Sequence, residues 1–315
     1  MKALRLLTAG LAGLIFTAAA HAAGGAEHPH PPEGGWPFDG PTGQFDQASL
    51  QRGYQVYKEV CSSCHSMKLM SYRNLGEPGG PFYDPAYPNP NDNPFVKALA
   101  ADNEILSPTP NDVGDYDYRP ATPADRFRSP FANVQAARAA NGGAAPPDLS
   151  VITKARHGGA SYVYRLLSGY PHEDAFVERE VDGEMVNFVD MSKMGGHGGE
   201  AGEGFLKVSP GQYYNPYMAG DTTPNYDGDP RHPPKGGFLA MPPQLIAGRV
   251  EYTREDAPEA TVDQMAYDVA QFLAWAGEPK QEHRKSLGLA VMGYLLLLAV
   301  LLWFSYKQIW RKIEH

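Results

Sequence analysis

The sequence predicts a mainly α-helical domain with long loops, followed by one C-terminal transmembrane helix. Helical periodicity is strong in two polar stretches of the chain, residues 46–64 and 261–277. The 315 residues include 29 prolines and 34 glycines, a content that favours long irregular connections. Near the C-terminus, residues 287–304 form an uncharged apolar run that, with the two residues after it, reaches the roughly 20 residues needed to cross a bilayer.

The first helical stretch begins near Asp46 or Ser49, because both residue types commonly cap a helix N-terminus. Apolar and aromatic side chains then recur at steps of three and four residues, which places them on one face of an amphipathic helix. The same stripe continues into the only two cysteines of the chain, so we expect both thiols to face the interior. Its members are Leu50, Tyr54, Tyr57, Cys61 and Cys64.

The second helical stretch has the clearest start signal in the chain. Thr261 and Gln264 form a capping-box pattern, while Gly277 and Pro279 mark the end of the helix. Its apolar positions form another stripe, which we expect to pack on the first helix. This stripe consists of Val262, Met265, Val269, Phe272 and Ala276.

The segments between these helices carry weaker signals. Residues 78–130 hold eleven prolines and little apolar periodicity, which predicts a long wrapping loop. Two short helices are predicted over 148–156 and 161–168, the first capped by the aspartate at its start. Residues 173–184 hold six acids against one base and form either a solvated face or a docking patch for a positively charged partner. The Gly-rich residues 191–204 predict a flexible loop.

The two ends of the chain predict an exported protein that is anchored in a membrane. Residues 1–22 combine a basic start, a short apolar core and an Ala-His-Ala cleavage signal, as in a secretory signal peptide. We expect a periplasmic domain over 23–283, a transmembrane anchor over 284–306 and a cytoplasmic tail over 307–315, whose basic residues agree with the positive-inside rule. A formal net charge of −9 argues against nucleic acid as a partner and favours a basic protein.

One short motif carries the chemistry of the chain. Cys61 and Cys64, with His65 directly after them, form a C-x-x-C-H pattern. This pattern is the signature of covalent c-type haem attachment: each thiol binds one haem vinyl group and the histidine binds the iron. A zinc site would need more ligands nearby, and a thioredoxin-like redox pair would need a βαβ context. The single motif therefore predicts a c-type cytochrome domain with one haem c.

The haem iron needs a second axial ligand if it only transfers electrons. Most methionines are excluded by their surroundings in the sequence, which leaves Met218 and Met241. The two prolines after Met241 hold its backbone extended and favour it over Met218; the alternative role is a core methionine. His172 and His197 stand in polar or Gly-rich surroundings and are weaker candidates. Arg156 is either a bidentate partner for a haem propionate or a solvated surface charge.

The motifs resemble those of cytochrome c1, the haem subunit of the cytochrome bc1 complex (ubiquinol–cytochrome c reductase), in its bacterial form. The resemblance begins at about Phe45 and reaches the C-terminus. It implies thioether bonds at Cys61 and Cys64, with His65 and Met241 as axial ligands. The segments that carry it are QRGYQVYKEVCSSCHSMK, PPDLSVITKARHGG, YYNPY, AMPP and FLAWAGEPKQEHRK.

The same resemblance implies four further residues near the haem: Asn141, Pro147, Arg156 and Tyr162, with Arg156 at a propionate. Some bacterial relatives carry an additional cysteine pair that forms a disulfide in the distal region. This chain has no such pair, so another device must hold the loop of Met241. Residues 182–204 do not follow the pattern of the family, and no function is carried over to them.

The function implied by the resemblance is electron transfer. The haem would accept one electron from the Rieske iron–sulfur protein and pass it to a soluble cytochrome c, in a dimeric complex with cytochrome b. No catalytic residue is expected in this subunit, because the oxidation of quinol belongs to the complex as a whole. Two alternatives remain at this point: a membrane-tethered c-type electron carrier outside this complex, and a haem-based ligand sensor with an open position at the iron.

Overall fold

The computed structural model describes residues 25–195, 202–254 and 256–311, so the predicted signal peptide lies outside the described residues. The chain divides into two compact units. The CXXCH unit, named after the haem-attachment motif, comprises Pro31–Ala132, Pro146–Ala160 and Tyr267–His315. The Met241 unit comprises Met1–His30, Asn133–Ala145 and Ser161–Ala266.

In the CXXCH unit, helix α2 spans Gln47–Glu59 and begins where the Asp46 carboxylate accepts hydrogen bonds from two backbone N–H groups. The helix ends before the cysteines, and Cys61–Ser63 forms a 3₁₀ turn. The stripe prediction is therefore wrong in its last turn. The reason is local: Ser62 Oγ donates to the Lys58 carbonyl at 2.6 Å, and such side-chain bonds compete with the backbone bonds that would continue the helix.

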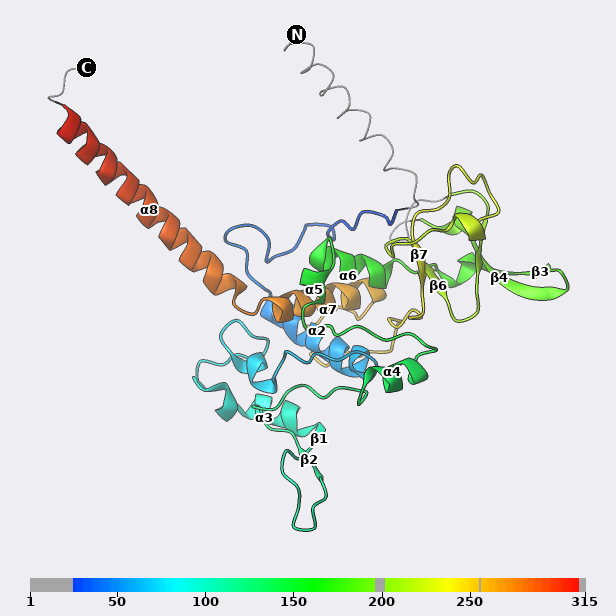
Figure 1. The fold of residues 1–315 in the computed structure, drawn as a ribbon, viewed down its shortest axis with the longest axis horizontal. Helices are drawn as coiled ribbons and strands as arrows, with labels where there is room; N and C mark the ends of the chain where they lie inside the picture. Colours follow the sequence, from blue (N-terminus) through cyan, green and yellow to red (C-terminus); the bar gives the residue numbers. More distant parts are fainter. Residues whose placement is uncertain (1–24, 196–201, 255, 312–315) are drawn as a thin grey trace, which may run out of the picture. The chain divides into compact units, whose positions relative to one another are not determined.

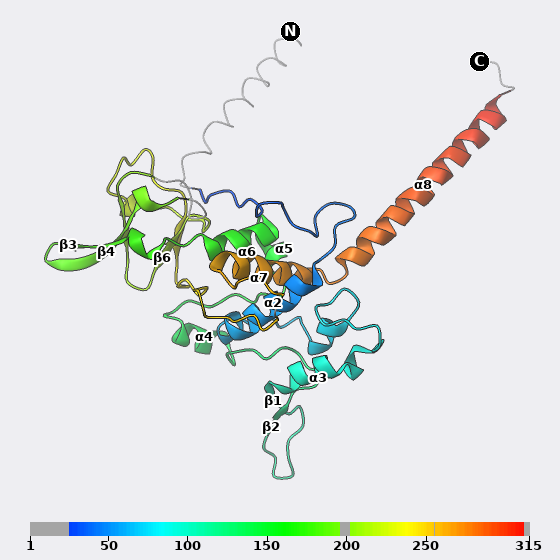
Figure 2. The ribbon, with the colours of Figure 1, turned by 180° about the vertical axis from the view of Figure 1, so that it is seen from behind.

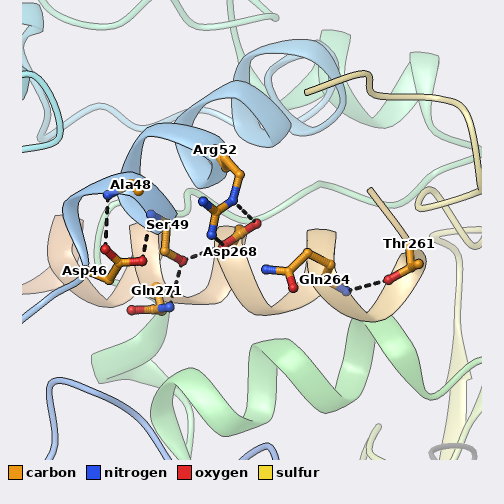
Figure 3. Close-up of polar contacts among 8 residues, drawn as sticks. All are labelled: Asp46, Ala48, Ser49, Arg52, Thr261, Gln264, Asp268 and Gln271. Carbon is orange, nitrogen blue, oxygen red and sulfur yellow. Dashed lines mark hydrogen bonds and ion pairs between the residues drawn. The ribbon is translucent and has the colours of Figure 1, made fainter. Parts of the chain in front are cut away.

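Helix α7 spans Val262–Gly277 and packs against α2, as predicted (Figure 3). Its start follows the predicted capping pattern, because Thr261 Oγ1 accepts the Gln264 N–H at 3.1 Å. The two helices approach closely at Gly53: a Cβ atom there would lie 2.1 Å from the Asp268 carbonyl oxygen. Only glycine fits such a crossing without a shift of one helix.

The loop predicted over 78–130 contains regular structure that the sequence analysis did not anticipate. Helix α3 spans Pro94–Ala101, and strands β1, Glu104–Leu106, and β2, Tyr118–Pro120, form a hairpin that projects beyond α3 (Figure 1). The Asn111 side chain closes the hairpin loop by accepting two backbone N–H groups. A further short α-helix of the CXXCH unit is α5, Ile152–Ala155.

The predicted membrane anchor is helix α8, Gln281–Trp310, which extends as one straight rod from the end of α7 (Figures 1 and 2). Among the described residues it is the one helix long and apolar enough to cross a bilayer, with a mean hydropathy of 2.5 over its most apolar window. Its first turns are tied to the N-terminal arm, since Glu282 accepts the Phe45 N–H at 2.7 Å and Lys285 donates to the Phe38 carbonyl. The arm is itself held by Trp36, which is buried and stacks on Tyr267.

The Met241 unit contains strands that the sequence analysis did not predict, so the fold is less purely helical than expected. Strands β3, β4 and β5 form an antiparallel sheet in that order, and β6 pairs with β7. Met191 and Met194 lie in the hydrophobic core of the larger sheet, although the sequence had suggested a flexible loop there. The elements of this unit are α4 (Val134–Ala140), most of α6 (Gly159–Ser168), β3 (Phe176–Val181), β4 (Glu184–Asp190), β5 (Phe205–Val208), β6 (Tyr213–Asn215) and β7 (Gly237–Leu239).

Candidate functional site

The C-x-x-C-H motif occupies the 3₁₀ turn that follows α2. The Cys61 carbonyl accepts the N–H groups of Cys64 at 3.1 Å and His65 at 2.9 Å, so the three residues form one tight turn. Both thiols are half-buried and are not bonded to each other. Two adjacent free thiols beside a histidine are the donor set that covalent haem attachment requires.

The His65 ring is oriented by a backbone carbonyl. Its Nδ1 atom lies 2.8 Å from the carbonyl oxygen of Pro147. Because a carbonyl can only accept, Nδ1 carries the proton and Nε2 keeps its lone pair. A metal-binding histidine commonly has this arrangement, since the bond at one nitrogen directs the other toward the metal. Pro147, which the resemblance placed near the haem, therefore contacts the predicted axial ligand.

Burial also favours the neutral form of His65. Burial is the largest influence and lowers the pKa of the ring, against the opposing effects of the Pro147 carbonyl and the nearby Asp148 carboxylate. The Asp148 pKa lies below its usual value: partial burial works to raise it, but hydrogen bonds, that of Ser150 first, outweigh this effect. A neutral imidazole next to an ionised carboxylate results, and neutral imidazole is the form that binds iron.

Arg156, the predicted propionate partner, lies directly after α5 and is exposed. Within the described part of the chain its guanidinium makes no hydrogen bond or ion pair. A guanidinium that is not already engaged by a carboxylate can bind one bidentately. This arrangement fits both expectations for Arg156, a propionate partner and a solvated surface charge.

Met241 belongs to the other unit and follows strand β7 closely. Its backbone carbonyl accepts a hydrogen bond from the Tyr170 hydroxyl at 2.8 Å, and its side chain is half-buried. No hydrogen bond to its sulfur is present among the residues that the structure describes. The rival candidate differs, because the Tyr162 hydroxyl lies 4.0 Å from the sulfur of Met218. Met241 is thus the methionine whose backbone is fixed while its sulfur is not engaged.

The eight predicted site residues divide between the two units. Those of the CXXCH unit are Cys61, Cys64, His65, Pro147 and Arg156, of which His65 and Pro147 are in direct contact. Those of the Met241 unit are Asn141, Tyr162 and Met241. The side chain of Asn141 donates to the Ala137 carbonyl at 2.7 Å and closes helix α4.

Two residues of the site escaped the sequence analysis. No local pattern around Tyr170 indicates that its hydroxyl reaches a residue 71 positions later. Asp148 had been assigned only as a helix cap. This prediction is wrong, because α5 begins only at Ile152 and has no side-chain cap. The Asp148 carboxylate instead accepts the Ser150 N–H at 2.9 Å and binds the segment after the haem motif.

The donor set fits a covalently attached haem. Two free thiols, a histidine with its Nε2 lone pair available and a methionine with an unengaged sulfur are the groups that a c-type haem requires. Over the described residues, no three side chains of His, Cys, Asp or Glu cluster in a way that could hold a metal ion.

Comparison with known proteins agrees with this donor set. A model of the Cytochrome C1 family matches residues 36–313. The chain belongs to the cytochrome C1 family. It is 40% identical over 282 residues to Cytochrome c1 of Rhodospirillum rubrum, a match that covers 89% of this chain and 87% of that protein. It is 39% identical over 310 residues to the mitochondrial heme protein Cytochrome c1 1 of Arabidopsis thaliana, covering 98% of this chain and 81% of the relative.

A further relative, Cytochrome b/c1 of Bradyrhizobium diazoefficiens, is 42% identical over 281 residues; the match covers 89% of this chain but only 35% of that longer protein. Members of the cytochrome C1 family carry one covalently bound haem c and transfer electrons in the cytochrome bc1 complex, together with cytochrome b and the Rieske iron–sulfur protein. The chain is therefore a membrane-anchored electron-transfer subunit with one haem c.

Proposed function

We propose that this chain accepts single electrons from the Rieske iron–sulfur protein and passes them to a soluble cytochrome c. The observation that carries the proposal is the 2.8 Å contact between His65 Nδ1 and the Pro147 carbonyl, because it prepares Nε2 as an iron ligand. When bound, haem c supplies the one-electron redox chemistry. The protein contributes attachment, ligation and orientation.

Each site residue has a defined role in this proposal. Cys61 and Cys64 would hold the haem by thioether bonds, and His65 and Met241 would bind its iron. A thioether ligand donates weakly and so favours ferrous iron, which raises the potential and suits a carrier near the end of a quinol-oxidising chain. If both residues bind the iron, no open position would remain for an external ligand, and a ligand sensor would be excluded.

The haem periphery is assigned to four residues. Arg156 pairs with a propionate through its unengaged guanidinium. Pro147 orients the axial histidine, while Asn141 and Tyr162 line the haem pocket. The support for Arg156 is its exposure and the absence, within the described part of the chain, of a competing carboxylate partner.

We also propose the orientation of the protein in the membrane. Residues 1–22 direct export and are removed, residues 23–283 form the periplasmic haem domain and residues 307–315 remain in the cytoplasm. The support is the signal-peptide pattern at one end and the basic tail after α8 at the other. In this orientation the haem faces the compartment that holds soluble cytochrome c. The complex is proposed to be dimeric.

The ligand assignment can be tested by replacing each candidate methionine with leucine. Met241→Leu should leave a covalent haem that binds carbon monoxide when reduced at neutral pH. Its potential should fall on the order of 0.1 V, within the roughly 0.8 V that axial ligands span. Met218→Leu is the matched control and should keep both the potential and the closed iron. The reverse pattern, with carbon monoxide binding only in Met218→Leu, would overturn the assignment.

A further inference from the structure

The segment after the haem motif lies against the segment that contains Pro147, and the two are joined by a set of hydrogen bonds. We propose that Asp148 is a positioning residue for His65: it locks these two segments in register and thereby holds the Pro147 carbonyl on the axial imidazole. This inference rests on the proposed role of His65 as an axial ligand. All of the residues involved belong to the CXXCH unit.

The Asp148 carboxylate binds both segments at once. Its Oδ2 atom accepts the Ser66 hydroxyl and the Lys68 backbone N–H, each at 2.8 Å. Its Oδ1 atom accepts the Ser150 N–H at 2.9 Å, which folds the carboxylate back over its own segment. One side chain therefore satisfies three donors, two of which come from residues within three positions of His65. Hydrogen bonds to a charged acceptor are stronger than neutral ones, so this contact is the firmest between the two segments.

Two more bonds show that the segments run side by side in one fixed register. The Leu149 N–H donates to the Ser66 carbonyl at 2.8 Å, and the Leu69 N–H donates to the Ser150 hydroxyl at 3.1 Å. These bonds continue the series that begins with His65 and Pro147. If the Asp148 bonds were lost, the remaining bonds would allow the Pro147 segment to move, and the carbonyl would no longer be held on Nδ1.

The expected consequence for the iron has two parts. The Nδ1–H bond to a carbonyl makes the imidazole a better donor and fixes its ring plane, and partners of this kind tune metal sites strongly when they are removed. The Asp148 charge acts in the same direction, since a nearby anion favours ferric iron over ferrous. Loss of Asp148 should therefore favour the reduced haem and change the orientation of the ring.

The test compares three variants of the full chain, purified in detergent with its haem. Asp148→Asn removes the charge and one of the two acceptor oxygens. Ser66→Ala removes a single bond and keeps the charge. Asp84→Asn is the matched control: its carboxylate accepts a backbone N–H two residues later at 2.8 Å, as Asp148 does, but it has no bond to the haem motif.

Two readouts are measured for each variant: the ratio of reduced to oxidised haem at a fixed ambient potential, and the electron paramagnetic resonance g-values of the ferric haem, which report the axial ligand planes. In Asp148→Asn the ratio should rise at least about threefold and the g-values should shift. Ser66→Ala should shift the g-values with a smaller change in the ratio. Asp84→Asn should match the wild type in both.

Wild-type values of both readouts in Asp148→Asn would overturn the inference. If Asp148→Asn fails to assemble with haem, the test rests on Ser66→Ala. Shifted g-values in that variant support the positioning role of Asp148, and unchanged g-values refute it. A failure of the proposed function would look different, because the wild-type protein itself would then lack the spectrum of a low-spin haem with histidine and methionine ligands.

Discussion

The buried ion pair that joins α2 to α7 leads to a sharp stability prediction. The Asp268 side chain is fully buried and accepts three donors: Arg52 Nε at 2.8 Å, a second Arg52 nitrogen at 2.9 Å and Ser49 Oγ at 2.5 Å (Figure 3). Gln271 extends the cluster by donating to Ser49 at 2.7 Å. Because α2 leads directly into the turn that holds the haem motif, this cluster fixes the helix that precedes the motif. The change we propose is Asp268→Asn.

The magnitude follows from what the asparagine cannot do. It keeps one oxygen as an acceptor but loses the bidentate geometry and the counter-charge for Arg52. A hydrogen bond to a charged group contributes roughly 1.5–3 kcal/mol, and breaking a buried pair costs about 3–5 kcal/mol. The side chain of Arg52 is 15% exposed, so water compensates part of the loss. We expect Asp268→Asn to lower the free energy of unfolding by about 2–4 kcal/mol.

Thermal unfolding of the full chain in detergent, followed by circular dichroism, measures this loss. For a protein of this size the melting temperature should fall on the order of 3–6 °C. Asp92→Asn is the control, because the Asp92–Lys97 pair is exposed and its atoms are 3.8 Å apart; it should leave the melting temperature unchanged. If Asp268→Asn melted together with this control, the reasoning about the buried pair would be refuted.

Two further predictions concern the methionine side and the partner surface. Tyr170→Phe removes only the hydroxyl that donates to the Met241 carbonyl, so the reduced variant should bind carbon monoxide more readily than the wild type. The control, Tyr213→Phe, should bind carbon monoxide as the wild type does. Equal binding in both variants would show that Tyr170 does not hold the loop of Met241. Neutralising the exposed acids of the β3–β4 hairpin, Glu178, Glu180, Asp182 and Glu184, should slow electron transfer to a basic cytochrome c at low salt about tenfold and flatten its salt dependence. The control neutralises the exposed acids of the β1–β2 hairpin, Glu104, Asp112, Asp115 and Asp117, and should leave the rate unchanged. Equal rates in the two variants would show that the acids of the β3–β4 hairpin are only a solvated face.

The elements that the sequence predicted well are those specified by local patterns. Helix α7 starts at its capping residue and ends at Gly277, and α8 follows from its apolar length alone. The C-x-x-C-H motif and the position of Met241 before two prolines are also local features. Each of these signals acts within a few residues of the chain, so the sequence is sufficient to read them.

One missed element had a readable signal. Strands β3 and β4 are joined by Asp182 and Gly183, which both have positive φ angles, 53° and 85°. An Asp-Gly pair between alternating apolar and polar residues is a strong indication of a two-residue hairpin turn. The turn lies within the acidic run, so the same residues carry a charge pattern and a hairpin signal. The acids from Glu178 to Glu184 lie on this hairpin, where their side chains are exposed.

Other features could not be read from the sequence because they join distant residues. The Pro147 carbonyl reaches His65 across 82 positions, and Arg52 meets Asp268 across 216. A buried aspartate on an otherwise apolar helix looks like a surface residue until its partner on another helix is known. The same holds for Tyr170, whose hydroxyl donates to the Met241 carbonyl across 71 positions.

The central claim is that one haem is bound covalently through both cysteines of the motif. The absorption spectrum of the full chain in alkaline pyridine tests it most directly, because pyridine replaces the axial ligands and the band position then reports how many vinyl groups are saturated. The account predicts one haem per chain, with the band of a haem whose two vinyl groups are both bonded to sulfur. A haem that is extracted by acidified acetone, or a band that indicates an intact vinyl group, would contradict it.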